Sequence, residues 1–429
     1  MWGAEPLEMR RSALLPLVLA LVPAAAPPPR QRRPDPTAFI EGQIEAGNIP
    51  GCSVAVTVGD ELAWHGAFGS AFPEDGASEF DATDETAFTF ASISKTITGV
   101  AVLMLHERGL VDLDADINTY LRPWSIAVDG ITLNMLMTHT SSITDDFYFT
   151  IPEGELYRDG DPTIDLEEFN IAMFTEGGRW FSESTFVGEP GERYDYTNVG
   201  SSLAAEVVEA VAIAAGLAPD YNTFVRRLIF APLGAAQGSH YLRDFPGAME
   251  PPLGARPSEF FRGEYESWAH YSVPDFPNGF WRSNSLTYAA LLGAVANDGV
   301  WQGTRMLSGA SVEIIKERTG LDGGRQGRAF WYYTSANSRV IGHEGAELGI
   351  ATMSYLDLET GVGATILTNG DFGQGGGFEQ AVERIVNHCL EIFGGGRKGG
   401  AVAVGESREV ARYLNRTGYS GQKLRARET

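Results

Sequence analysis

Apolar residues recur every three to four positions in several stretches of this chain, and this spacing predicts amphipathic helices. One such stretch begins at Ser92 and runs to about Gly109, where a glycine suits a helix end. Its apolar face is formed by Ile93, Ile97, Val100, Ala101, Met104 and Leu105. A Ser at this position is typical of a helix cap. Lys95 follows one turn later, so a nucleophile paired with its base is the second interpretation.

Strand-like and helix-like segments alternate along the rest of the chain. The segment "CSVAVTVGDELAWHGAFG" predicts a hairpin joined at Gly59-Asp60, and "RAFWYYT", "ATMSYLDL" and "GVGATILTN" predict late strands. Helices are predicted for "SSLAAEVVEAVAIAAG", "YNTFVRRLIFAPLG" and "FEQAVERIVNHCLEIF". We therefore expect one domain over 37–393, with an α/β lobe from about 37–111 and 283–393 and a mostly helical lobe from about 112–282 inserted between them.

Both ends of the chain differ from this domain. Residues 1–26 resemble an export signal, with Arg10 and Arg11 ahead of the apolar run "SALLPLVLALVPAAA", which is too short to span a bilayer. Residues 27–36 form a Pro/Arg-rich linker, and Pro27 would hinder cleavage beside it. We expect an exported protein, periplasmic or extracellular, with an uncleaved N-terminal membrane anchor as the alternative. Composition predicts a flexible tail over 394–429.

Composition excludes several classes of function. The chain has 429 residues, of which 43% are hydrophobic, and a formal net charge of −24, so nucleic acids and anionic membrane surfaces would repel it. Its two cysteines, Cys52 and Cys389, allow one disulfide but no cysteine metal cluster. The seven histidines show no paired spacing of a helical zinc site. We expect no metal and no cofactor.

Three motifs carry candidate chemistry. The first is Ser92 with Lys95, which is the only lysine before Lys316 in a chain that otherwise uses arginine. Lysine can lose its proton when desolvated, whereas arginine cannot. The same S-x-x-K pattern also occurs in the tail, at Ser420 and Lys423, so the motif alone is weak evidence.

The second motif is "PGERYDYTNVG" and the third is "IGHEGAELGI". Tyr196 and Asn198 lie on a connection before a helix, where a phenol beside a lysine could accept the serine proton. His343 and Gly345 lie beside a strand whose backbone N–H groups could bind an oxyanion. Taken singly, each motif has an ordinary structural interpretation: aromatic packing and a helix cap for the second, and a surface turn for the third.

Together the motifs resemble the serine β-lactamase and penicillin-binding-protein superfamily, in particular its class C β-lactamase, D,D-carboxypeptidase and esterase branch. The blocks "FASISKTITGVAVLMLHERGLVDLDADINTYL", "ITLNMLMTHTSSI", "PGERYDYTNVGSSLAAEVVE", "PNGFWRSNSLTYAALLGAVANDG" and "GHEGAELGIATMSYLDLETGVGATILTNGD" occur in family order. The resemblance implies an α+β fold, with an antiparallel sheet flanked by helices, an inserted helical lobe and an active site between the lobes.

The resemblance also implies roles for individual residues. Ser92 would be both the first residue of its helix and the nucleophile, with Lys95 or a Tyr196 phenoxide as the base. The backbone N–H groups of Ser92 and Ala346 would form the oxyanion hole, and Asn198 would orient Lys95 and a substrate amide. Either Lys95 or Tyr196 could take the proton. Burial of the Lys95 amine and its interaction with Tyr196 would lower the pKa of that amine.

One departure from the family concerns the substrate. His343-Glu344-Gly345 stands where many penicillin-recognising relatives have Lys-Thr-Gly. We expect Glu344 to repel carboxylates if it faces the substrate, which disfavours β-lactams and D-Ala-D-Ala peptides. The sequence thus predicts a serine hydrolase acting on a small-molecule or peptide ester or amide. The alternative is a catalytically silent envelope protein that binds peptidoglycan or another ligand.

Overall fold

The computed structural model describes residues 33–73, 81–245, 258–261, 264–372 and 377–396. The signal-like segment 1–26, residues 27–32 of the linker and the tail beyond residue 396 lie outside these residues, so the interpretations of those segments stay predictions. Contacts divide the chain into Met1–Arg33 and Pro34–Thr429, and every element below belongs to the second unit. None of the helices in the described ranges is both long and apolar enough to cross a membrane.

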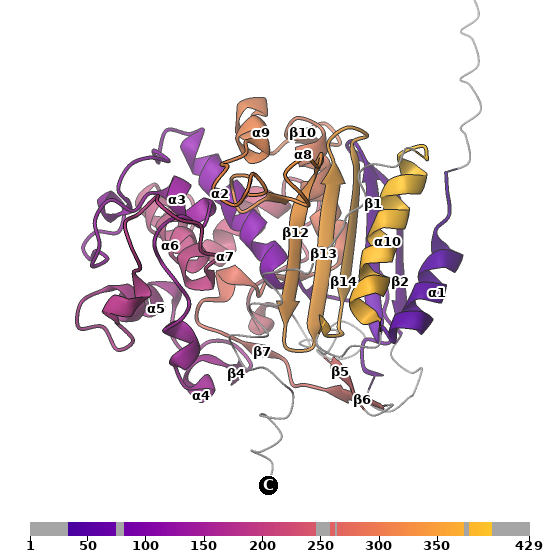
Figure 1. Cartoon of the computed structure of the whole chain (residues 1–429), viewed down its shortest axis with the longest axis horizontal. Helices are drawn as coiled ribbons and strands as arrows, with labels where there is room; N and C mark the ends of the chain where they lie inside the picture. Colours follow the sequence, from indigo (N-terminus) through magenta and orange to yellow (C-terminus); the bar gives the residue numbers. More distant parts are fainter. Residues whose placement is uncertain (1–32, 74–80, 246–257, 262–263, 373–376, 397–429) are drawn as a thin grey trace, which may run out of the picture. The chain divides into compact units, whose positions relative to one another are not determined.

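A six-stranded antiparallel sheet in the order β11-β12-β13-β14-β1-β2 organises the fold (Figure 1). Its strands are β1 (Gly51–Val58), β2 (Glu61–Gly69), β11 (Tyr332–Tyr333), β12 (Val340–Glu347), β13 (Ile350–Asp357) and β14 (Val362–Thr368). Strands β1 and β14 come from opposite ends of the domain and pair along seven residues. The expected α+β fold with an antiparallel sheet is therefore confirmed.

Helices cover both faces of this sheet. Helices α1 (Thr37–Gly47) and α10 (Phe378–Phe393) pack together on one face, over an apolar core that includes Ile40, Met353 and Ile385. Helix α8 (Ser285–Ala296) packs on the opposite face against β1 and β14. A second and larger core lies on this side of the sheet and continues into the helical region.

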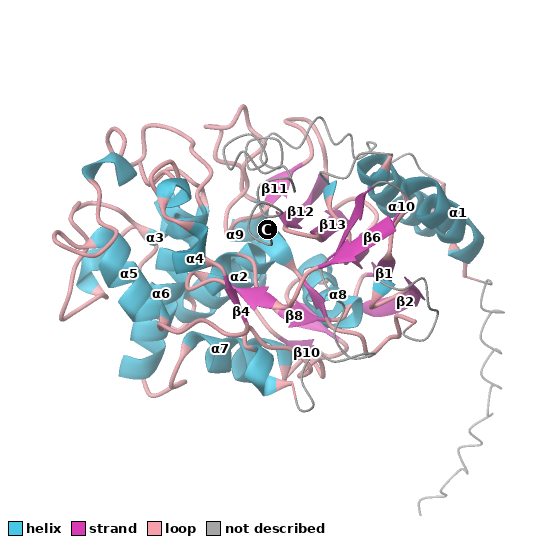
Figure 2. Ribbon diagram, turned by 90° about the horizontal axis from the view of Figure 1, so that it is seen from below, coloured by secondary structure: helices cyan, strands magenta, loops and turns pink. Residues whose placement is uncertain are grey.

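The helical region lies at the far end of the molecule from α1 and α10 in the view of Figure 2. Its helices are α2 (Ser94–His106), α3 (Leu133–Met137), α4 (Glu153–Leu156), α5 (Leu166–Phe174), α6 (Asn198–Ala214) and α7 (Tyr221–Phe224), which continues as a π-helical turn over Val225–Phe230. Short strand pairs and the helix α9 (Gly309–Lys316) complete the unit. The strand pairs are β3 (Phe88–Thr89) with β8 (Arg282–Ser283), β4 (Arg158–Asp159) with β7 (Tyr271–Ser272), β5 (Ser258–Phe261) with β6 (Glu264–Ser267), and β9 (Val300–Trp301) with β10 (Thr304–Arg305). Helix α2 packs on α6, and the 3₁₀ turn Ala91–Ile93 that leads into α2 contacts β12 and β13, so this segment joins the helical region to the sheet.

Local pattern predicted several of these elements. The hairpin turns at Gly59, whose φ of 58° is one that glycine adopts readily, and α10 spans the predicted segment from Phe378 to Phe393. The expected strand "RAFWYYT" is wrong except for Tyr332–Tyr333. Ala329 and Phe330 instead take φ values of 56° and 64°, which no strand residue adopts.

Tertiary contacts explain that error. The carbonyl of Ala329 lies so close to α2 that a Cβ on Gly99 would fall 2.1 Å from its oxygen. The N–H of Phe330 donates to the carbonyl of Met137 at 3.0 Å, so this segment bonds the helical region instead of the sheet. Packing thus overrides the strand propensity that the aromatic residues give to this segment.

The two cysteines do not form the disulfide that their number allowed. Cys52 in β1 and Cys389 in α10 are free thiols, both fully buried in the core between the sheet and α10. Burial raises the pKa of each thiol to about 12. Such thiols stay protonated at neutral pH and serve as small apolar core residues.

Candidate active site

Ser92 lies in a 3₁₀ turn, Ala91–Ile93, that leads directly into α2. The helix itself begins at Ser94, so Ser92 precedes it and is not its first residue. No side-chain cap hydrogen bond is made at the start of the turn or of the helix, so the Ser92 hydroxyl is not a helix cap. Ala91 has a φ of 47°, a conformation that costs a non-glycine residue energy and is typical of functional sites.

The Lys95 amine is fully buried beneath this serine and contacts three oxygen atoms. Its Nζ donates to the Ser92 Oγ at 3.0 Å, to the Asn198 Oδ1 at 2.8 Å and to the backbone carbonyl of Asn278 at 2.8 Å. An amide oxygen and a carbonyl oxygen can only accept hydrogen bonds. Two N–H groups of the amine are therefore fixed by these acceptors, and its third position faces the serine.

This third position suits a base. The serine hydroxyl can accept a hydrogen bond from an ammonium group or donate one to a neutral amine. A neutral Lys95 would keep both N–H donors on its two fixed acceptors and direct its lone pair at the Ser92 O–H. The geometry thus serves both protonation states without moving any heavy atom.

Asp145 fixes one of the acceptors. Its buried carboxylate accepts from the Asn198 side-chain amide at 2.9 Å, from the Thr197 hydroxyl at 2.7 Å and from the backbone N–H groups of Asn198 and Val199. These N–H groups open α6, where a negative charge is favourable. Because the Asn198 amide nitrogen is held by Asp145, its oxygen must point at Lys95. Burial raises the pKa of the Asp145 carboxyl, and the hydrogen bonds and Lys95 oppose that rise.

Asp275 fixes the second acceptor in a similar way. Its fully buried carboxylate accepts from the Asn278 side-chain amide at 2.6 Å and from the Tyr148 hydroxyl at 3.0 Å. Asn278 ends the 3₁₀ turn Phe276–Asn278, and its backbone carbonyl accepts from Lys95. Burial raises the pKa of Asp275 to about 7.

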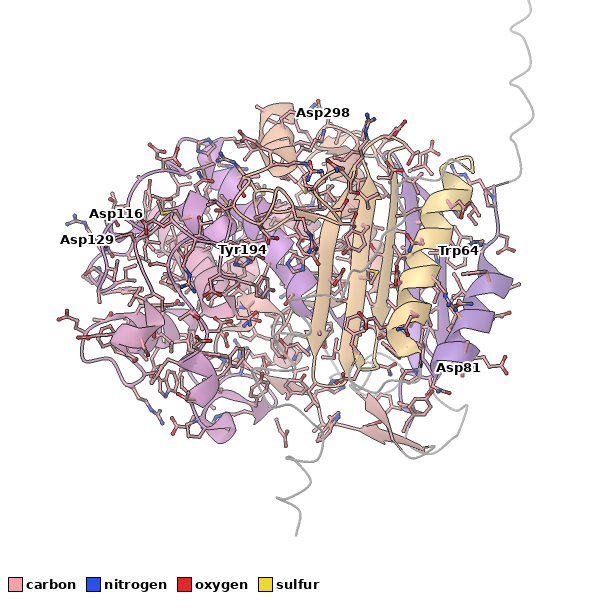
Figure 3. All side chains as sticks on the ribbon, viewed as in Figure 1. Trp64, Asp81, Asp116, Asp129, Tyr194 and Asp298 are labelled. Carbon is pink, nitrogen blue, oxygen red and sulfur yellow. The ribbon has the colours of Figure 1, made fainter. Side chains whose placement is uncertain are left out.

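Tyr196 lies over the amine, with its ring centroid 5.1 Å from the Lys95 Nζ. The ring also packs against His139, at 4.4 Å between centroids, and against His343, at 6.3 Å. His139 accepts the backbone N–H of Thr197 through its Nδ1 at 3.2 Å, so that nitrogen carries no proton. Tyr194, labelled in Figure 3, completes this aromatic group, with its ring 6.0 Å from that of His139.

Strand β12 runs directly against the serine. A Cβ on Gly345 would lie 2.8 Å from the Ser92 backbone nitrogen and 2.4 Å from the Thr352 hydroxyl, so only glycine fits there. This close approach brings the following residue, Ala346, beside the Ser92 turn. Ser92, Tyr196 and Ala346 are each partly exposed to solvent, whereas Lys95 below them is not.

Side chains alternate between the two faces of β12, which separates His343 from Glu344. His343 shares the face of Gly345, toward Tyr196, and its Nδ1–H donates to the carbonyl of Glu344. Burial, and then the charge of Lys95, lowers the pKa of His343 to about 3, so the ring is neutral at neutral pH. Burial, followed by Lys95 and His343, also holds the pKa of His139 well below its usual range.

Glu344 points to the opposite face, where its carboxylate accepts from the Tyr355 hydroxyl on β13. Tyr355 belongs to the core beneath α10. The expectation that Glu344 repels substrate carboxylates required it to face the serine, and this condition is not met. The sequence could not reveal this, because one position of strand register decides the face on which a side chain lies.

The structure gathers seven of the eight predicted residues around one serine: Ser92, Lys95, Tyr196, Asn198, His343, Gly345 and Ala346. Sequence reasoning missed Asp145, Asp275, His139 and the carbonyl role of Asn278. His139 and Asn278 lie within the quoted blocks "ITLNMLMTHTSSI" and "PNGFWRSNSLTYAALLGAVANDG", but no role had been assigned to either. Among the described residues, no three His, Cys, Asp or Glu side chains are grouped in a way that could hold a metal ion.

Comparisons with known proteins show the family and the fold of the chain. A family model described as Beta-lactamase matches residues 37–386. Penicillin-binding protein 4* of Bacillus subtilis is 24% identical over 193 residues, which cover 44% of this chain and 38% of that protein. The matched part is thus well under half of that relative's length.

Solved structures share the fold. An octameric penicillin-binding protein homologue from Pyrococcus abyssi superposes with a TM-score of 0.64 at 21% identity, over 85% of this chain and 78% of that chain. The D-amino acid amidase of Ochrobactrum anthropi SV3 gives a TM-score of 0.61 at 21% identity, over 83% of this chain and 98% of that one. At this identity the likeness establishes the fold alone.

Replacing Asp145 with Ala tests the buried anchor at the start of α6. Four donors would lose their acceptor in a buried place, so we expect the free energy of unfolding to fall by about 3 kcal/mol. Chemical denaturation of the purified protein measures the loss. Asp146→Ala is the matched control, because this neighbouring side chain is exposed, and we expect it to change stability by less than about 0.5 kcal/mol. Equal losses in the two variants would contradict the assignment.

Proposed function

The chain belongs to the beta-lactamase family, and from this premise we propose that it is a serine hydrolase acting through an acyl-enzyme on an ester or amide. The observation that carries the proposal is the Lys95 amine, held 3.0 Å from the Ser92 hydroxyl by two acceptors that cannot themselves take part in proton transfer. A nucleophile within hydrogen-bond reach of an oriented base is the arrangement that acyl transfer requires.

In the first step, the Ser92 Oγ bonds to the substrate carbonyl carbon and its proton passes to the base. Lys95 and a Tyr196 phenoxide are both candidates for this base, because the phenol ring lies over the amine. The oxyanion accepts hydrogen bonds from the backbone N–H groups of Ser92 and Ala346. Its collapse breaks the bond to the leaving alcohol or amine, which takes up the proton. Water then attacks the acyl-Ser92 ester and releases the acid, which restores the serine.

Charge around the serine favours neutral substrates. Strand β12 contains no lysine or arginine, and the histidine in the place of the family's lysine is neutral. A substrate carboxylate would therefore meet no fixed cation on this strand. The preference for neutral esters and amides, which the sequence had based on Glu344, rests instead on the neutrality of His343. The signal-like segment 1–26 supports export of the enzyme as part of the proposal.

Ser92→Ala tests the nucleophile, and the same labelling experiment distinguishes a hydrolase from a catalytically silent binding protein. We expect the wild-type protein to be labelled by a fluorophosphonate and the variant to be unlabelled, with intact mass as the measurement. Ser420→Ala is the matched control, because Ser420 also precedes a lysine by three residues but lies in the tail. An adduct on the Ser92→Ala protein would reject the assignment, and a wild-type protein that no acylating probe modifies would favour the binding protein.

Lys95→Arg tests the base. Arginine keeps the positive charge but cannot accept a proton, so we expect kcat/KM for a p-nitrophenyl ester to fall at least about 100-fold. Circular dichroism checks that the variant is folded. Turnover within a few-fold of wild type would show that Lys95 acts only through its charge.

His343→Lys tests substrate selectivity. The new ammonium group would attract anionic substrates by roughly 1–4 kcal/mol, so we expect kcat/KM for nitrocefin to rise at least about fivefold relative to that for a neutral ester. Glu344→Gln is the control, since this side chain lies on the other face of β12 and its loss of charge should leave the ratio unchanged. A ratio that moves in Glu344→Gln but not in His343→Lys would reverse the interpretation.

A further inference from the structure

Asp275 is a buried carboxylate for which the proposed reaction gives no direct role. It does not touch the serine or the lysine; its two oxygens accept from Asn278 and Tyr148. Taking a carboxylate out of water costs several kcal/mol unless other groups compensate. Among the described residues, no lysine or arginine forms an ion pair with it, and Lys95 is the cation whose charge acts on it. This carboxylate is linked to the Lys95 amine through a single residue, Asn278, which suggests that its burial serves the site.

We infer that Asp275 is a positioning residue for the proposed acyl transfer, which acts by fixing the Asn278 carbonyl that holds the Lys95 amine against Ser92. The inference rests on the proposed function. The path is short and continuous: the Tyr148 hydroxyl anchors the carboxylate, the carboxylate anchors the Asn278 amide, and the Asn278 carbonyl accepts from Lys95.

The anchoring is needed because the Asn278 carbonyl lies in a short turn. Three residues, Phe276–Asn278, form this 3₁₀ turn, which has too few internal hydrogen bonds to fix a carbonyl direction by itself. The Asn278 amide adds two bonds to Asp275, one to the carboxylate at 2.6 Å and one to the backbone carbonyl at 2.8 Å. Tyr148 comes from another 3₁₀ turn in the helical region, so the anchor also links two distant segments.

Protonation of Asp275 would disturb this anchor. The Asn278 amide nitrogen can only donate, so a proton on the carboxyl must sit on the oxygen that faces Tyr148. The Tyr148 hydroxyl would then have to turn and accept, and the carboxyl would become a weaker acceptor for Asn278. The acid form should therefore hold Lys95 less firmly than the ionised form.

Asp275 gains or loses its proton near neutral pH. Burial raises the pKa of Asp275 to about 7, Asp145 raises it further, and Tyr148 and Lys95 oppose the rise. Burial, then Asp275 and more weakly Tyr157 and Glu347, hold the pKa of Tyr148 well above its usual range, so its hydroxyl stays protonated. The two histidines near Lys95, His139 and His343, stay neutral because their pKa values are lowered. Below pH 7 Asp275 is protonated and above it ionised, so activity should rise with pH through this range.

The test is the second-order rate constant for fluorophosphonate labelling, measured from pH 5.5 to 9 in wild type and in Asp275→Asn. Asparagine resembles the protonated carboxyl in size and charge. We expect the wild-type rate to rise about tenfold through pH 7, and the variant to lack this step and to react at least about tenfold more slowly at pH 8. A loss of fold alone would scale the whole profile without removing the step.

Glu209→Gln is the matched control. Burial also raises the pKa of Glu209, on α6, to about 7, but this side chain bonds the Tyr221 N–H and not the site. We expect this variant to keep the wild-type step, and a step lost in Glu209→Gln but kept in Asp275→Asn would overturn the inference. A rate for Asp275→Asn within threefold of wild type at pH 8 would also overturn it.

Asn278→Ala decides the matter if Asp275→Asn does not fold. This variant keeps the backbone carbonyl and the carboxylate but removes the bond between them, so we expect a rate at least about fivefold below wild type at pH 8. A wild-type rate in folded Asn278→Ala would reject the anchor. Labelling of wild type but not of Ser92→Ala shows that the proposed function holds even where the anchor fails. An unlabelled wild-type protein would overturn both.

Discussion

Burying one amine beneath a serine is the constraint on which the rest of this site depends. An ammonium group out of water costs several kcal/mol unless oxygen atoms and opposite charges surround it. Lys95 is fully buried and meets three oxygens within 3.0 Å. Two of those oxygens belong to Asn198 and Asn278, and the side-chain amides of these residues donate to the buried carboxylates of Asp145 and Asp275. The helix α6 and the turn before β8 (Arg282–Ser283) are thereby tied to the same atom.

Close backbone contact is the second requirement. The serine turn lies against β12 at Gly345, and the segment at Ala329 lies against α2 at Gly99, so a side chain on either glycine would collide with backbone atoms. The positive φ values of Ala91, Ala329 and Phe330 occur in the segments that make these contacts. Strain of this kind persists only where the surrounding packing holds it, and here the surrounding packing includes the larger apolar core. The partly exposed serine is thus held by closely packed backbone on two sides.

The electrostatics of the site follow from the same burial. Burial, and then the positive charge of Lys95, lowers the pKa values of His139 and His343 and keeps both rings neutral, so the aromatic group around Tyr196 adds no second cation. The negative charges nearby are used by hydrogen bonds inside the protein: Asp145 by α6, Asp275 by Asn278 and Tyr148, and Glu344 by Tyr355. The net charge of −24 therefore says little about the field at Ser92, which a few buried groups set.

By itself, the sequence predicted several local elements and most of the residues that gather at the candidate site. Periodic apolar positions predicted α6 and α10, and alternation with a Gly-Asp turn predicted the hairpin of β1 and β2. Spacing and the family resemblance pointed to Ser92, Lys95, Tyr196 and Asn198 as site candidates. These features depend on neighbours in the chain or on motifs a few residues long. Tertiary structure alone decided that Ala329 and Phe330 leave the sheet, that Glu344 turns away from the serine, and that Asp145 and Asp275 brace the lysine. Each of those outcomes depends on strand register or on contacts between segments far apart in the chain, such as the bond that the Lys95 amine donates to the Asn278 carbonyl, 183 positions away. No local pattern records such contacts, because packing, and not propensity, brings them together.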